Sequence, residues 1–201
     1  MQAFHNQQSI KDRYLVRLQA HYLADEITQG VYWENGRGCA IGCTIHGDDH
    51  RRYETELGIP ARVAILQDII FERLPKAEAK EFPTQFLSAI VPGADLALVF
   101  DKFILWIIED EQLGIVGLAK DERLVDLAKR AAAIYRRRIN GETVTDDELR
   151  ALRDEARALA RALARALDLA RALALDLALD LDRAWCDKLL ELLVAATPVP
   201  A

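Results

Sequence analysis

The sequence has little of several features that mark particular classes of protein. Only three of its 201 residues are cysteine, at Cys39, Cys43 and Cys186. This odd and small number argues against a disulfide scaffold and favours free thiols. Basic residues are not in excess, since 26 Lys and Arg stand against 32 Asp and Glu and give a formal net charge of -6. Contact with a nucleic-acid backbone normally needs a basic surface, so we do not expect duplex nucleic acid as a partner.

Long apolar runs are also missing. The most apolar stretch, residues 96–108, is interrupted by Asp101 and Lys102 and is shorter than the roughly 20 residues that a membrane-spanning helix needs. The first nine residues show the pattern of neither a secretory nor a transit signal. With 51% hydrophobic residues, the chain is too apolar to be disordered. We therefore expect a globular, cytoplasmic protein without a membrane partner.

No segment alternates apolar and polar residues for long enough to indicate a strand. Apolar residues recur instead at three- and four-residue spacing, which is typical of helices. A further helix after Pro75 should break or kink at Pro83. The predicted fold class is all-α, with a compact helical core domain over residues 1–141 and a helical tail over residues 142–201. The main predicted helices cover residues 10–29, 60–74, 96–113 and 121–139.

The tail has an unusual composition. Residues 145–194 contain neither glycine nor proline and consist largely of Ala, Leu, Arg and Asp in near-repeats. A capping box from Thr145 to Glu148 should begin the helix, whose charged residues form a narrow stripe on an otherwise apolar surface. Such a helix must be covered by protein. We expect one long helix, unbroken or broken at an unmarked point, that packs back on the domain or forms a homo-oligomer.

The residues whose side chains are suited to binding or catalysis lie mainly in one loop. Six of the ten glycines fall within residues 30–58, and long ordered loops in compact domains are often functional. Two residues of the preceding helix, His21 and Asp25, lie one turn apart and would form an imidazole–carboxylate pair facing the loop. The candidate ligand-binding residues are His21, Asp25, Tyr32, Trp33, Arg37, Gly38, Cys39, Gly42, Cys43, Thr44, His46, His50, Arg51 and Arg52.

The first interpretation of this loop is an anion-binding site. Glycines would let backbone amides point into one concavity, arginines would neutralise a phosphate, and an aromatic ring would stack on a base. The pattern is neither a P-loop nor a dinucleotide-binding fingerprint. It predicts a non-enzymatic protein that binds or sequesters a small anionic, nucleotide-like ligand. The residues concerned are Gly36, Gly38 and Gly42, then Arg37, Arg51 and Arg52, and the rings of Tyr32, Trp33 and Tyr53.

The alternatives use the cysteines or the tail. Cys39, Cys43 and His46 have spacings that one helical turn would place on a common face, where they would hold zinc, with His50 one turn further on. Familiar structural zinc sites use two separated ligand pairs, so our primary prediction has no cofactor and zinc is the alternative. The same thiols with His46 would suit a cysteine- or metal-dependent hydrolase or transferase. A third alternative is a protein–protein interaction module that acts through the tail. Asp68 and Glu72 are interpreted as solvated surface charges.

Two motifs carry a resemblance to a family. Residues 38–44 read Gly-Cys-Ala-Ile-Gly-Cys-Thr, and residues 56–60 read Glu-Leu-Gly-Ile-Pro. With the Ala-rich repetitive tail, they resemble a family of uncharacterised bacterial and phage-borne helical proteins, and the resemblance covers most of the chain. It implies an all-α fold and a role in phage–host conflict, such as an anti-defence protein that sequesters a nucleotide signal. It implies no particular activity, so the functional prediction depends on the loop residues.

Overall fold

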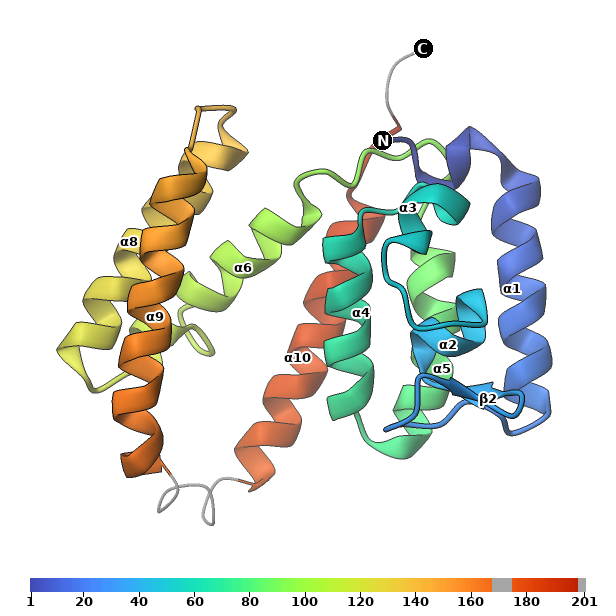
Figure 1. Cartoon of the computed structure of the whole chain (residues 1–201), viewed down its shortest axis with the longest axis horizontal. Helices are drawn as coiled ribbons and strands as arrows, with labels where there is room; N and C mark the ends of the chain where they lie inside the picture. Colours follow the sequence, from blue (N-terminus) through green and yellow to red (C-terminus); the bar gives the residue numbers. More distant parts are fainter. Residues whose placement is uncertain (168–174, 199–201) are drawn as a thin grey trace. The chain divides into compact units, whose positions relative to one another are not determined.

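The structure, a computed structural model, describes the backbone of residues 1–167 and 175–198 and is all-α, as the periodicity predicts (Figure 1). The one sheet in this part of the chain is a small antiparallel pair, β1 (Trp33–Glu34) and β2 (Arg37–Gly38). The chain forms two compact units, Met1–Phe100 with Asp182–Ala201, and Asp101–Leu181. Each unit is described by itself.

The first unit is built around the glycine-rich loop. Its short helix α2 (Ala40–Ile45) is buried at every residue and contacts α1, α4 and α5. The largest buried side chains of this unit include Tyr53, Phe71 and Phe82. The helices of this unit are η1 (Ala3–Asn6, a 3-10 helix), α1 (Gln8–Leu23), α2, α3 (Arg52–Leu57), α4 (Ala61–Arg73), α5 (Lys76–Ala89) and the end of α10 (Leu175–Val194).

The predicted helices are present, with some different ends. α1 stops before residue 29 because Asp25 takes a left-handed conformation, with φ at 57°, which a continuing helix does not allow. α5 runs through Pro83, which is buried inside it, so the helix does not end there.

The end of the tail packs back on the first unit, one of the two predicted outcomes. The Asp182 carboxylate accepts a hydrogen bond from Arg73 Nε at 2.5 Å, and Leu189 and Leu193 are fully buried. Beyond the helix, the Asp95 amide donates to the Thr197 carbonyl at 2.8 Å. In the Ala- and Leu-rich repeats of the tail, the structure gives a helix up to residue 167 and another from residue 175. The predicted polar stripe runs from residue 153 to residue 183, and its side chains from 161 to 180 lie outside the described residues. The predicted homo-oligomer stays a prediction.

The second unit contains α6 (Val99–Glu109, whose first residues belong to the first unit), α7 (Ile115–Leu118), α8 (Glu122–Ile139) and α9 (Asp146–Leu167). Its apolar cluster centres on Ile108, Ala128 and Ala132. The predicted capping box is present, since the Thr145 amide donates to Glu148 Oε2 at 2.8 Å and the Glu148 amide to Thr145 Oγ1 at 3.2 Å. In the described part of the chain no helix has the length and apolarity to cross a membrane.

Candidate functional site

The loop glycines allow two backbone segments to approach closely. A Cβ at Gly42 would lie 1.5 Å from the carbonyl oxygen of Tyr32, and one at Gly38 would lie 2.1 Å from the same atom. The Gly38 amide donates to the Glu26 carbonyl at 3.0 Å, and the Cys39 amide donates to Val31 at 2.7 Å. These two amides are therefore occupied by protein carbonyls and are not available to a phosphate.

The three loop arginines have different surroundings. Arg51 pairs with Asp49 at 2.9 Å, and Arg52 pairs with Glu56 at 2.6 Å. Arg37 instead lines a pocket to which neither of the other two contributes. Of the three arginines expected to bind a phosphate together, Arg37 is therefore the one that lines this pocket.

All three rings expected to stack on a base have partners within the protein. Trp33 stacks on His46, with 4.4 Å between ring centroids and 13° between planes. Tyr53 is fully buried and donates to Gln67 Oε1 at 3.0 Å. The exposed Tyr32 donates to Asp68 Oδ2 at 3.3 Å. Thr44, also a candidate, is buried, and its hydroxyl donates to the Ala40 carbonyl at 2.7 Å.

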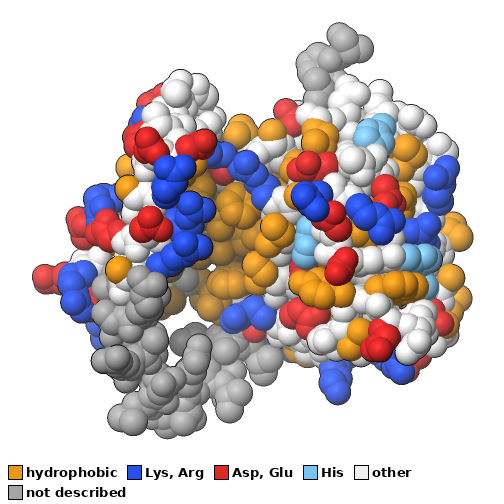
Figure 2. Space-filling view, in the orientation of Figure 1, with side chains coloured by type: hydrophobic (Ala, Val, Ile, Leu, Met, Phe, Trp, Pro, Cys, Tyr) orange, Lys and Arg blue, Asp and Glu red, His pale blue; other side chains and the backbone are white. Residues whose placement is uncertain are grey.

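A chain of three polar side chains ends on His46. His21 Nδ1 lies 2.6 Å from Glu26 Oε2, and His21 Nε2 lies 2.9 Å from His46 Nε2. The expected pair of His21 with Asp25 does not form, because Asp25 is ion-paired with Lys80. Figure 2 shows histidine side chains at the surface of the first unit.

These contacts limit where the protons lie. His21 Nδ1 donates to the Glu26 carboxylate, and one proton is shared between His21 Nε2 and His46 Nε2, so that one of these two nitrogens donates to the other. Burial lowers the pKa of His46, and the charge of Arg17 lowers it further. His46 is therefore held as a neutral base.

The two loop thiols are buried. Cys39 is 1% exposed and Cys43 is fully buried, and the Cys43 thiol donates to the Gly38 carbonyl at 3.2 Å. Burial raises the pKa of each of the two thiols to about 12. Without a bound metal ion, burial therefore favours the protonated thiol at neutral pH, whereas a cysteine nucleophile acts as the thiolate. His46, the expected partner of the thiols, is bonded to His21 instead.

The structure groups Cys39 with Asp68 and Glu72, which the sequence predicted to be solvated surface charges; Glu72 is exposed, but the Asp68 side chain is only 14% exposed. The Cys39 sulfur, an Asp68 oxygen and a Glu72 oxygen all lie within 4.8 Å of one another. His50 Nε2 lies 3.2 Å from Asp68 Oδ2. Among the described residues this is the one such group of potential metal ligands, so the zinc set of Cys39 with Cys43 and His46 does not assemble.

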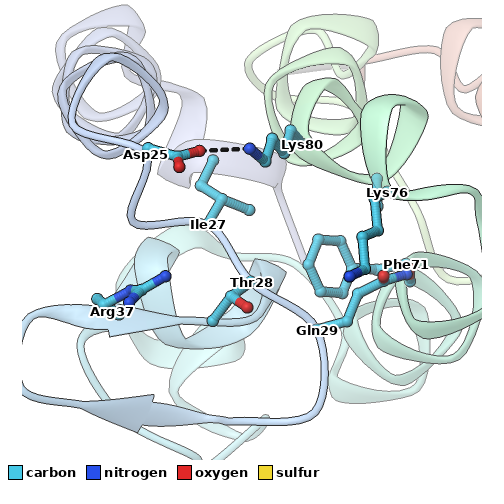
Figure 3. Close-up of a pocket in the computed structure, with 9 residues that line it drawn as sticks. Asp25, Ile27, Thr28, Gln29, Arg37, Phe71, Lys76 and Lys80 are labelled. Atoms are coloured by element: carbon cyan, nitrogen blue, oxygen red, sulfur yellow. Dashed lines mark hydrogen bonds and ion pairs between the residues drawn. The ribbon is translucent and has the colours of Figure 1, made fainter.

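A second feature is a pocket of about 260 Å³ (Figure 3). The loop after α1 and strand β2 form one side, with Arg37 and Thr28, and the first turns of α5 form the other, with Lys76 and Lys80. Gln29 fixes the loop, because its amide donates to the carbonyls of the α4 end at 2.8 Å. The pocket is therefore lined by cations on a preformed frame. Its lining residues are Asp25, Ile27, Thr28, Gln29, Arg37, Phe71, Lys76, Ala79 and Lys80.

No family model, curated protein or solved structure matches this chain. The resemblance to bacterial and phage helical proteins therefore stays a prediction. Function has to be argued from the chemistry of the site.

The sequence contained weak signals for the residues that were missed. Asp68 and Glu72 are four residues apart in the predicted helix 60–74, so they share a face. Lys76 and Lys80 repeat this spacing at the start of the next helix. Nothing in either pair indicated that the loop would lie against it, because that contact joins positions about 40 residues apart.

Proposed function

We propose that the protein binds a small anion, a phosphate or a carboxylate, in the pocket of Arg37, Lys76 and Lys80 and releases it unchanged. The observation that carries the proposal is that the cations of the pocket have few partners within the protein. Within the described residues, Arg37 and Lys76 have neither an ion-pair nor a hydrogen-bond partner, and Lys80 pairs with Asp25 alone. An anion between them would relieve the mutual repulsion of these charges.

The frame of the pocket adds to this preference. Lys76 is the first residue of α5, where the helix dipole contributes positive potential. Because Gln29 holds the loop against the end of α4, little ordering is needed when a ligand enters. Arg37 would contribute a planar fork that matches phosphate or carboxylate oxygens.

The size of the pocket limits the ligand. About 260 Å³ is below the range of roughly 300–1,000 Å³ that is typical for drug-sized ligands. None of Tyr32, Trp33 and Tyr53 lines it, so the expected stacking on a nucleobase has no support here. The charged group of a small metabolite, including the phosphate of a mononucleotide, is the part that we expect to be recognised.

Calorimetric titration tests the proposal with inorganic phosphate, a nucleoside monophosphate and a small dicarboxylate. Loss of one charge-assisted hydrogen bond costs about 1.5–3 kcal/mol, so Arg37→Gln should weaken binding by roughly 10- to 150-fold, and Lys76→Gln should also weaken it. Arg13→Gln is the matched control, since it removes an exposed charge outside the pocket. Absence of binding at millimolar ligand, or equal binding by all variants, would refute the proposal.

The chain from Glu26 through His21 to His46 favours a second candidate function, hydrolysis with His46 as a general base. The carboxylate orients His21, and His21 orients His46, as in the relays of known hydrolases. The test is the release of product from activated esters and phosphodiesters. We expect His46→Gln to lower the rate by at least about 100-fold, whereas His5→Gln should not change it. A wild-type rate equal to that of His46→Gln would exclude this function.

A further inference from the structure

We propose that Cys39, Asp68 and Glu72 bind a divalent transition-metal ion, with zinc as the best fit, and that His50 holds Asp68 in position. The donor set comprises one sulfur and two carboxylate oxygens. Zinc accepts this mixture, whereas magnesium and calcium prefer oxygen ligands alone. Three protein ligands leave a fourth position for water or another ligand atom.

The ligands are already close to the geometry of a bound ion. With metal–ligand bonds of about 2.0–2.3 Å, the ligand atoms of a tetrahedral site lie roughly 3.5 Å apart. The three atoms here lie within 4.8 Å of one another, so small side-chain rotations would bring them to that distance. The elements that hold them are ordered: Asp68 and Glu72 lie one turn apart on α4, and Cys39 is the N-cap of α2.

An unsatisfied atom points independently to a missing partner. Asp68 Oδ1 is buried and has no partner at hydrogen-bond distance, although such an oxygen normally has one. From within the cluster, the donor that interacts with this carboxylate is the Cys39 thiol, itself a proposed ligand. The other oxygen of this carboxylate accepts from His50 Nε2 at 3.2 Å and from Tyr32 Oη at 3.3 Å. Asp68 thus has one oxygen held by outer hydrogen bonds and one left open. This arrangement is typical of an oriented metal ligand.

The charges around the site also lack compensation. In the part of the chain that the structure describes, neither Asp68 nor Glu72 pairs with a lysine or an arginine. Glu72 accepts one hydrogen bond, from the Gly30 amide at 2.9 Å. Two carboxylates close to a thiol repel one another, and a divalent cation between them would remove this repulsion. Glu72 lies on the exposed face of α4, so an ion can enter past its side chain.

Cobalt(II) provides the test, because a cobalt–thiolate bond gives a charge-transfer band in the near ultraviolet. The full-length protein is stripped with a chelator and titrated with Co²⁺, and zinc is then added as competitor. We expect a band that saturates at one ion per chain and disappears with zinc. Cys39→Ser should abolish the band, whereas Cys43→Ser should keep it. Cys43 is the matched control because it is a buried thiol in the same loop.

A second variant keeps the test decisive if Cys39→Ser fails to fold. Glu72→Gln removes a partly exposed ligand, and its affinity for Co²⁺ should fall at least about 10-fold. Glu81→Gln, on the exposed side of α5, should not change the affinity. The proposal is overturned by absence of a thiolate band, by a band that Cys39→Ser retains or Cys43→Ser abolishes, or by unchanged affinity in Glu72→Gln. The site shares no residue with the anion pocket, so either proposal can fail without the other.

Discussion

The most direct test of the loop's packing is the substitution Gly42→Ala. Gly42 lies inside α2, and alanine in a helix interior is normally more favourable than glycine by about 0.8–1.0 kcal/mol. Helix propensity alone would therefore predict a more stable protein. The structure predicts the opposite, because the added Cβ would lie 1.5 Å from the Tyr32 carbonyl oxygen.

The expected loss of stability in Gly42→Ala depends on which atoms must move to make room for the added Cβ. Overpacking of a core usually costs about 1–3 kcal/mol when flexible side chains can adjust. Here the obstacle is a backbone carbonyl in a segment whose neighbours are fixed, since the Cys39 amide donates to Val31 and Tyr32. We therefore expect Gly42→Ala to lower the free energy of unfolding by more than about 3 kcal/mol. In a domain with a total stability of about 5–15 kcal/mol, this is a large loss.

Gly47→Ala is the matched control in the same loop. A Cβ at Gly47 would come within 2.6 Å of Arg52 Nη1, the end of a flexible side chain that can rotate away. Its cost should stay below about 1 kcal/mol. Urea unfolding followed by circular dichroism measures both variants. Equal or higher stability of Gly42→Ala would refute the explanation of the loop by close backbone approach.

Two further predictions concern pH and the tail. Burial lowers the pKa of His46 below its usual 6.5, so the unfolded chain binds more protons and the stability of the protein should fall as pH drops below about 6.5. The urea midpoint should therefore decrease less between pH 7.5 and pH 5 in His46→Gln than in His5→Gln. An equal decrease in the two variants would contradict this. Arg73→Ala leaves the buried Asp182 carboxylate without the arginine that pairs with it and should cost about 1.5–3 kcal/mol. Arg183→Ala, at a more exposed pair, should cost less than about 1 kcal/mol, and limited proteolysis of α10 would rank the two variants.

The sequence predicted the helices better than their mutual contacts. Apolar spacing was enough to locate α4 and α8 within a residue or two, because helical periodicity is local information. The end of α6 could have been recognised at Asp110, whose carboxylate accepts the amides of Gln112 and Leu113 at 3.0 and 2.9 Å. Asp side chains often bind nearby backbone amides in this way, in place of the hydrogen bonds that would continue the helix.

The candidate site could be located but not assembled from sequence. Glycines in a loop indicate either a ligand cradle or a close backbone approach, and only coordinates distinguish these. Here the Tyr32 carbonyl occupies the space at Gly38 and Gly42. The sequence also offered two acidic partners for His21, and the structure uses Glu26 and not Asp25. The chain turns sharply after α1, so that the Glu26 amide donates to the His21 carbonyl.

The division of the chain into units has a consequence for biosynthesis. The first unit consists of residues on both sides of the second one, and its core includes Leu189 and Leu193. The second unit, Asp101–Leu181, takes roughly 4–16 s to translate at about 5–20 residues per second. During this delay the apolar surface that α10 will cover is exposed on the nascent chain, and chaperones have time to bind it. The first unit therefore completes its folding only after the ribosome has made a second domain.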